Sequence, residues 1–247
     1  MFDNERSLRI LLPEGYDRER EEPYPVLYMN DGQNLYSAED SMTGQEWQMD
    51  EILPSLIKNG NLEPIIVVGI DTLSYADRAN EYLPWPDEYL TPYIEEPMGS
   101  SYPDFLEQEV LPLIEQKYNV GKTPRYRTLG GSSYGGLITL YTAVSSELFS
   151  KYLIESPSLY VAKGAIFKLL KRRRVKADKI YMGIGTHEGL STCDQAANED
   201  AVDDLRRAVE LMSGNFKLYD EVEECGLHSE NDWARRLPTT LIHLFGN

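Results

Sequence analysis

The sequence contains only two cysteines and three histidines among its 247 residues. Two cysteines exclude a small scaffold stapled by several disulfides, although they leave room for one bridge. No group of Cys and His residues has the spacing of a zinc site, so no metal is expected. Three histidines also restrict any histidine-dependent chemistry to three positions.

Basic residues are scarce as well. Lys and Arg sum to 24 against 41 Asp and Glu, which gives a formal net charge of −17. This balance excludes a nucleic-acid binder and a protein that docks on anionic membranes, because both need a basic face. The single basic run, at 170–176, is interpreted as the solvated end of a helix.

Long apolar segments are also missing. The longest aliphatic run covers 64–70, far short of the roughly 20 residues that span a bilayer. The first twelve residues carry charges where a signal peptide needs an apolar core. We therefore expect a cytoplasmic protein with no membrane partner; the sequence does not indicate its oligomeric state.

What the chain does contain is an alternation of strand and helix patterns. Strands are predicted at 7–13, 23–30, 63–71, 125–131, 150–156, 178–185 and 215–222, and helices at 45–58, 102–118, 135–145, 194–212 and 230–245. Pro54 marks a kink or break in the first helix, and Pro238 interrupts the last. Residues 85–101 are rich in Pro and aromatics and are predicted to form a loop or lid.

This alternation predicts an α/β fold, with a mostly parallel central sheet covered by helices on both faces. A length of 247 residues fits one domain over 1–247, since α/β units of this size often do not divide. Ligands of such sheets bind at the carboxyl ends of the strands. Functional residues are therefore expected in the turns that follow the strands.

The turn after the strand at 125–131 carries the strongest chemical signal. Residues 131–135 read G-S-S-Y-G, with Ser133 at the centre. They fit G-x-S-x-G between a strand and a helix, which is the context of a nucleophile elbow. Such a turn strains the central residue and needs glycine two positions away on each side. We therefore predict that Ser133 is a catalytic nucleophile.

A serine hydroxyl needs a base to accept its proton. In α/β hydrolases the chain order is serine, acid, histidine, and His228 is the histidine that leaves room for an intervening strand and acid. Its position after the strand at 215–222 also suits this role. His243, near the end of the last helix, is interpreted as a packing residue. We predict His228 as the base.

The acid should follow a strand between Ser133 and His228. Glu188 comes directly after the strand at 178–185 and is the first candidate. Asp194 is its competitor, although its segment also suits the capping of a helix N-terminus. Asp220 lies inside a strand and is less suitable. The acid would orient the imidazole and stabilise its cation.

An oxyanion hole needs two N–H donors held in advance. One is the amide of the residue after the nucleophile, Tyr134, and the second should come from the loop after an early strand. That loop follows the strand at 23–30 and contains Gly32, which permits close backbone approach. We predict the amide of Gln33 as the second donor.

The segment VLYMNDGQNLY at 26–36 resembles the D-G-Q-N-L-F segment of the putative-esterase family of α/β hydrolases. That family includes feruloyl and acetyl-xylan esterases, siderophore (enterochelin) esterases and S-formylglutathione hydrolases. RANEYLPW at 78–85 is similar to the family's R-x-x-E-Y-x-P segment, and LGGSSYGG at 129–136 to its elbow. GTHEG at 185–189 and GLHSENDW at 226–233 resemble its acid and histidine turns. The resemblance covers nearly the whole chain and implies the α/β-hydrolase fold with Ser133, Glu188 and His228 as the triad.

The resemblance also implies where substrate binds. The expected substrate-binding residues follow strands at the ligand end of the sheet: Asp31, Arg78, Tyr82, Trp85 and Ser156. A pocket lined by Tyr and Trp suits an aromatic acyl group or a sugar ring. Four acids in the loop, Asp87, Glu88, Glu95 and Glu96, favour neutral or cationic substrates over anionic ones.

The expected activity is that of a serine esterase. It would hydrolyse a carboxylic ester (short acyl, feruloyl-type or sugar acetyl) through an acyl-enzyme, without a cofactor, and its partner would be a small-molecule ester. Three alternatives stay open: a siderophore (enterochelin-type) ester hydrolase, an acyltransferase with the same triad, and a non-catalytic binding protein on a hydrolase scaffold.

Overall fold

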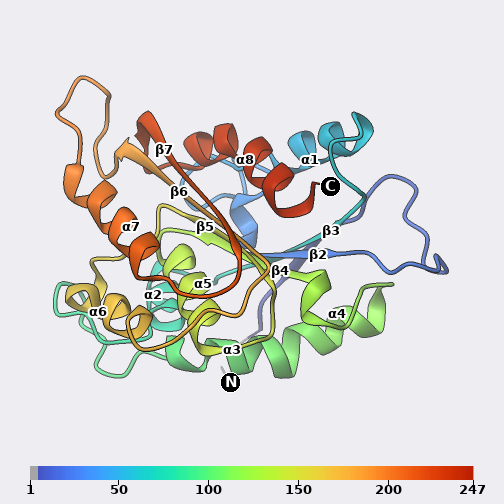
Figure 1. The fold of residues 1–247 in the computed structure, drawn as a ribbon, viewed down its shortest axis with the longest axis horizontal. Coiled ribbons are helices and arrows are strands. Elements are labelled where there is room, and N and C mark those ends of the chain that lie inside the picture. Colours follow the sequence, from blue (N-terminus) through green and yellow to red (C-terminus); the bar gives the residue numbers. More distant parts are fainter. Residues whose placement is uncertain (1–4, 247) are drawn as a thin grey trace.

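The computed structural model describes residues 5–246, which build one seven-stranded sheet with helices on both faces (Figure 1). The strands are β1 (Leu8–Leu11), β2 (Val26–Asn30), β3 (Ile66–Ile70), β4 (Arg127–Ser132), β5 (Lys151–Glu155), β6 (Lys179–His187) and β7 (Lys217–Leu227). Their order is β1-β3-β2-β4-β5-β6-β7. β1 runs antiparallel to β3, and the other neighbouring pairs are parallel. The predicted fold class is confirmed.

The helices form two layers. They are α1 (Met49–Lys58), α2 (Tyr75–Tyr82), α3 (Tyr102–Phe105), α4 (Leu111–Lys117), α5 (Tyr134–Ser145), α6 (Val161–Leu170), α7 (Glu199–Leu211) and α8 (Glu230–Phe245). α1 and α8 lie together on one face of the sheet, and α3 to α7 cover the other (Figure 1).

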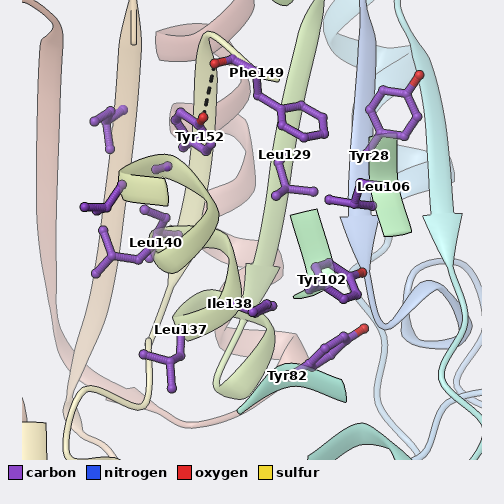
Figure 2. Close-up of a cluster of buried hydrophobic side chains, with 14 of the residues drawn as sticks. Tyr28, Tyr82, Tyr102, Leu106, Leu129, Leu137, Ile138, Leu140, Phe149 and Tyr152 are labelled. Carbon is purple, nitrogen blue, oxygen red and sulfur yellow. Dashed lines mark hydrogen bonds between the residues drawn. The ribbon is translucent and has the colours of Figure 1, made fainter. Parts of the chain in front are cut away.

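Strand β2 shows why both faces need a cover. All five of its residues are buried, and successive side chains point to opposite faces. Leu27 and Met29 pack in the cluster shared with α1 and α8. Tyr28 packs on the other side, edge-on against Phe149 at 5.8 Å between ring centres (Figure 2). A strand that is apolar on both faces is stable only between two layers of helices.

The two prolines do not end their helices. α1 continues through Pro54, and α8 runs unbroken from 230 to 245 through Pro238, so the predicted interruption at Pro238 is wrong. Proline removes one helical hydrogen bond, at a cost of about 3 kcal/mol. The apolar face of α8, which includes the buried Trp233 and Leu241, packs on the sheet and offsets that cost.

Other helices and strands begin or end at residues different from those predicted. α7 begins at Glu199 rather than 194, because Asn198 caps it by accepting a hydrogen bond from the amide of Ala201. The strand predicted at 215–222 extends to Leu227 in β7. The helix predicted over 102–118 is α3, a π-helical turn at Leu106–Val110 and α4 in direct succession. α2 was not predicted.

The segment 83–98 between α2 and the 3-10 turn at Gly99–Ser101 has no helix or strand, in agreement with the loop predicted at 85–101. Within residues 5–246 no helix combines the length and the apolar character needed to cross a membrane.

Candidate active site

Ser133 occupies a sharp turn between β4 and α5. Its backbone has φ 59° and ψ −123°, in the positive-φ region that side chains rarely adopt. Its amide donates to the carbonyl of Glu155 in β5 at 3.0 Å. The turn therefore holds Ser133 at the carboxyl end of β4 and at the positive end of α5.

Glycine is required around this turn for lack of space. A Cβ on Gly131 would lie 2.8 Å from the backbone of Gly135, and one on Gly135 would lie 3.1 Å from Asp31 Oδ2. The first contact, below 3.0 Å, would force atoms to shift, and the second is tighter than most real Cβ contacts. The elbow thus packs directly on the loop that follows β2, and the predicted strand–turn–helix context is present.

Glu188 and His228 meet across the ends of β6 and β7. Glu188 directly follows β6, His228 directly follows β7, and Glu188 Oε2 is hydrogen-bonded to His228 Nδ1. The second oxygen, Oε1, accepts from Ser156 Oγ at 2.6 Å and from the amide of Gly185 at 2.9 Å. The competitor Asp194 is exposed and makes no such contact.

These contacts determine the ionisation of Glu188. Burial raises the pKa of its carboxyl group. The hydrogen bond and charge of His228, together with the hydrogen bonds from Ser156 and Gly185, lower that pKa by more than burial raises it. The pKa of Glu188 therefore lies below its ordinary value, and the carboxylate is ionised at neutral pH.

Trp233 and Ser156 contact the Glu188–His228 pair and hold it in place. The indole Nε1–H of Trp233 donates to Ser156 Oγ at 2.9 Å, and the same hydroxyl donates to Glu188. The Trp233 ring also packs edge-on against the His228 imidazole, 5.2 Å between ring centres. Ser156, predicted to bind substrate, thus has its hydroxyl engaged with the acid. No role for Trp233 was predicted.

Ser133 lies beside a cavity that reaches this pair. Its Oγ is 3.4 Å from Ser158 Oγ. Ser158, Glu188 and His228 line a cavity of about 220 Å³, together with Tyr160. Within residues 5–246 the structure has no hydrogen bond between Ser133 Oγ and His228 Nε2. Catalytic hydrogen bonds of free enzymes are often long and tighten when substrate binds.

The loop after β2 presents its backbone to the elbow. Residues Gly32–Asn34 form a 3-10 turn, and the side chain of Gln33 is fixed by Thr72: Nε2 donates to Thr72 Oγ1 at 3.0 Å, and the Thr72 amide donates to Oε1 at 3.1 Å. Across residues 5–246, neither the amide of Gln33 nor that of Tyr134 donates a hydrogen bond. Both amides are thus free to bind an oxyanion.

Three of the predicted substrate-binding residues contact one another instead of an open pocket. Arg78 donates to both carboxylate oxygens of Asp31, at 2.8 and 2.9 Å, and to the carbonyl of Ser132 at 3.3 Å. The Tyr82 hydroxyl accepts from the Asp31 amide at 3.2 Å. This buried network ties the loop after β2 to the elbow. Trp85 packs edge-on against Tyr141 of α5, 5.6 Å between ring centres.

Glu230 connects the loop after β2 to the turn that carries His228. No role for Glu230 was predicted. Its Oε1 accepts from Asn34 Nδ2 at 2.9 Å, and its Oε2 accepts from Thr43 Oγ1 at 2.7 Å. Burial raises the pKa of its carboxyl group. The S-x-x-D pattern that starts α8 with Ser229 was the available signal for a helix start, but not for this contact.

Among residues 5–246, two groups of side chains have donor atoms close enough together for a metal ion. One consists of His187, Cys193 and Cys225, and its two cysteines form a disulfide. The other is an acidic group around the start of α1, Glu46, Asp50 and Glu51. Neither group contains Ser133, Glu188 or His228.

The family model described as "Putative esterase" matches residues 1–244. The apo-salmochelin esterase of Escherichia coli is 33% identical over 146 residues, which cover 55% of this chain and 42% of that protein.

Solved structures share the fold. The BES protein of Bacillus cereus superposes with a TM-score of 0.75 at 19% identity, covering 97% of this chain and 89% of the other. The enterobactin esterase of Shigella flexneri superposes with a TM-score of 0.74 at 20% identity, covering 98% of this chain and 55% of its own. The chain therefore belongs to the Putative esterase family of α/β hydrolases and is a carboxylic ester hydrolase.

Proposed function

We propose that the protein hydrolyses its ester as a serine esterase with Ser133 as nucleophile, His228 as base and Glu188 as acid. The observation that carries this proposal is the hydrogen-bonded Glu188–His228 pair at the ends of β6 and β7, which lines the cavity beside the strained elbow of Ser133. A nucleophile, an orienting acid and a base are the parts that acyl transfer needs, and Ser133, Glu188 and His228 follow one another in that chain order.

In the proposed reaction, Ser133 Oγ attacks the ester carbonyl while His228 Nε2 accepts the hydroxyl proton. The Nδ1–H of the imidazolium donates to Glu188, whose lowered pKa keeps it anionic and able to stabilise that cation. His228 then gives the proton to the leaving alcohol. A water molecule, deprotonated by the same imidazole, releases the acid from Ser133.

The amides of Tyr134 and Gln33 are the proposed oxyanion hole. Each has a free N–H, and the Gln33 side chain is anchored on Thr72, so the loop is held before substrate arrives. A donor of this kind contributes roughly 10²–10³ in kcat. The network of Asp31, Arg78 and Tyr82 is proposed to hold the loop against the elbow rather than to contact substrate directly.

Two classes of ester are proposed as substrates. The first is a short-acyl, feruloyl-type or sugar acetyl ester, and the exposed Tyr160, which lines the cavity, suits an aromatic or sugar ring. The second is a siderophore ester, which is favoured by the identity with apo-salmochelin esterase and by the likeness to enterobactin esterase.

The charge expected to repel anionic substrates is smaller than the sequence indicates. Asp87 is buried and Glu88 forms an ion pair with Lys163 at 2.7 Å, which leaves Glu95 and Glu96. We therefore propose a weak preference for uncharged esters, to be measured as kcat/KM for a neutral ester and its anionic analogue.

The central test is Ser133→Ala. We expect this variant to fold and to lose hydrolysis of a short-chain aryl ester, together with labelling by a fluorophosphonate probe. Unchanged turnover of the aryl ester by Ser133→Ala would refute the proposal. A panel of feruloyl, acetyl-sugar, short-acyl and siderophore esters, compared by kcat/KM on the wild-type protein, would separate the two substrate classes.

A further inference from the structure

The pairing of β6 with β7 changes register just before the site. The two strands pair in step from Lys179 opposite Lys217 to Gly185 opposite Glu223, and the next pair is His187 opposite Leu227. Two steps along β6 (185 to 187) therefore match four along β7 (223 to 227), so β7 carries two extra residues here. This is a β-bulge.

The bulge decides which residues face each other at the site. Glu188 and His228 are the next residues after the His187–Leu227 pair, so the bulge puts acid and base side by side. Without it, Glu188 would face Gly226, and His228 would lie two residues, roughly 6–7 Å, farther along the strand. No hydrogen bond spans that gap.

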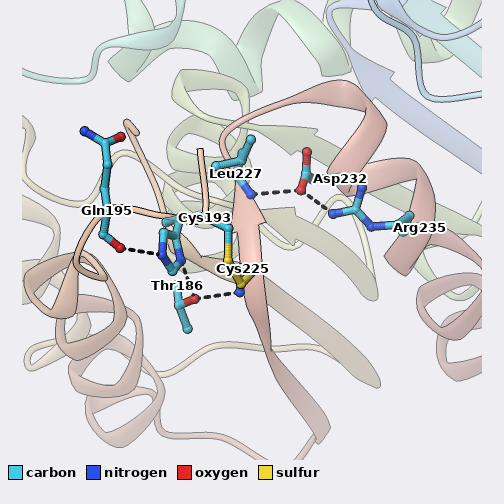
Figure 3. Close-up of a disulfide and its surroundings, with 8 residues drawn as sticks. Thr186, Cys193, Gln195, Cys225, Leu227, Asp232 and Arg235 are labelled. Carbon is cyan, nitrogen blue, oxygen red and sulfur yellow. Dashed lines mark hydrogen bonds and ion pairs between the residues drawn. A yellow bond between two sulfur atoms is a disulfide. The ribbon is translucent and has the colours of Figure 1, made fainter. Parts of the chain in front are cut away.

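Cys225 is the residue in the bulge with the unusual backbone. Its φ is +60°, which disfavours side chains other than glycine and needs other contacts to hold it. Two contacts do so: a disulfide to Cys193, and a hydrogen bond from its amide to Thr186 Oγ1 at 2.9 Å (Figure 3). Both reach across from the β6 side of the pair.

The partners of Cys225 are themselves connected to the segment that follows Glu188. Thr186 Oγ1 lies 2.9 Å from His187 Nδ1, and His187 Nε2 lies 3.0 Å from the carbonyl oxygen of Gln195. A carbonyl only accepts, so Nε2 carries the proton in the neutral imidazole and Nδ1 accepts from the Thr186 hydroxyl. Cys193 and Gln195 both belong to this segment (Figure 3).

The bulge also packs without space for adjustment. A Cβ on Gly185 would lie 2.1 Å from the carbonyl oxygen of Gly226, so the two backbones touch. The bulge is thus held by backbone contact with Gly185 as well as by the disulfide and Thr186.

We propose that Cys225 is a positioning residue: through its disulfide to Cys193 and its hydrogen bond to Thr186, it sets the register that brings Glu188 opposite His228. This inference rests on the proposed function, because it assigns a purpose to the Glu188–His228 contact. Cys193, Thr186 and Cys225 are not among the residues that line the 220 Å³ cavity. Loss of the contacts should therefore lower kcat and leave KM nearly unchanged.

The first experiment compares Thr186→Val with Thr186→Ser. Valine has the same shape but cannot accept the Cys225 N–H, whereas serine keeps the oxygen. We expect Thr186→Val to lose about 10- to 100-fold in kcat, as small displacements of catalytic groups do, with KM within about twofold, and Thr186→Ser to stay near the wild type. A wild-type kcat in Thr186→Val, or a change confined to KM, would overturn the proposal.

The second experiment opens the disulfide in the folded protein. Dithiothreitol supplies two electrons and two protons, giving the thiols of Cys193 and Cys225 and oxidised dithiothreitol, and thiol titration counts the product. We expect reduction to lower kcat to the level of Cys193→Ser/Cys225→Ser, and that variant to be insensitive to the reductant. A fully reduced wild type with undiminished kcat refutes the role of the disulfide even if the double variant fails to fold.

A spectroscopic readout separates positioning from general loosening. The His228 Nδ1–H proton, hydrogen-bonded to Glu188, should give a far-downfield ¹H NMR signal that Glu188→Gln lacks. This signal should disappear in Thr186→Val while far-UV circular dichroism is unchanged; its persistence contradicts the proposal. If Ser133→Ala is inactive and Thr186→Val matches the wild type, this inference alone fails; if Ser133→Ala is active, the proposed function fails first.

Discussion

Replacing Glu188 by Gln would test the proposed acid most directly. The carboxylate accepts from His228 at Oε2 and from Ser156 and Gly185 at Oε1. A glutamine side chain has one acceptor oxygen and one NH₂ donor. Because two donors converge on the Oε1 position, the oxygen should stay there, and the NH₂ group should face the imidazole.

An NH₂ group facing Nδ1 turns that nitrogen into an acceptor, so the imidazole proton moves to Nε2. His228 can then no longer take the proton of Ser133. The matching change in a serine-protease triad costs about 10⁴ in kcat through the same wrong tautomer, and we expect a loss of that order here, with KM within about threefold.

The assay is steady-state hydrolysis of 4-nitrophenyl acetate at neutral pH, with folding checked by circular dichroism. Asp194→Asn is the matched control, because Asp194 is a nearby carboxylate that is exposed and does not contact His228. We expect this control to keep wild-type activity. A loss of less than about tenfold in Glu188→Gln, or a larger loss in Asp194→Asn, would refute the assignment of the acid.

Three further predictions concern the surroundings of the acid. Burial raises the pKa of Glu188, but its hydrogen bonds lower it more, so the pKa lies below the ordinary 4.5. The ionised carboxylate therefore contributes its full free energy of unfolding above about pH 4.5, and this contribution disappears as pH falls through the lowered pKa. If the difference in unfolding free energy between the wild type and Glu188→Gln, measured with urea, grew on acidification, this reasoning would be wrong. Arg236 forms a buried ion pair with Glu155 at 2.8 Å, so Arg236→Ala should cost about 3–5 kcal/mol in urea unfolding, and a cost under about 1 kcal/mol would be inconsistent with it. Trp233→Phe keeps the ring on His228 but removes the donor to Ser156, and kcat/KM should fall about 2- to 10-fold; a loss as large as that of Glu188→Gln would show that the indole has another role.

The elements of the fold follow from local pattern, and most of them could be predicted from it. The strand, turn and helix around Ser133 are contiguous, and the glycines at 131 and 135 reveal the turn because a side chain at 131 would clash with the backbone and one at 135 would crowd Asp31. α2 also had a local signal, Ser74 capping the amide of Asp77, which matches the S-x-x-D pattern of a helix start. It lies in a short polar stretch whose helical periodicity is weak.

The choice between Glu188 and Asp194 depends on something the local pattern does not carry. Glu188, the proposed acid, meets His228 through the register of β6 against β7, in which β7 carries two extra residues. The pairing of Arg78 with Asp31, 47 residues apart, is likewise a product of the folded chain. Sequence spacing indicated that these residues lie at one end of the sheet, but not that they bind each other.

The strand that presents His228 is also the last strand of the sheet, because β7 has β6 on one side and no strand beyond it in residues 5–246. An uncovered edge is where a strand of another chain can add and begin aggregation. β7 carries four acidic residues, Asp220, Glu221, Glu223 and Glu224. Glu223 is ion-paired with Arg235 and Arg236, but a second copy approaching edge to edge would still bring like charges against the other three, so part of the net charge of −17 disfavours strand addition at this edge.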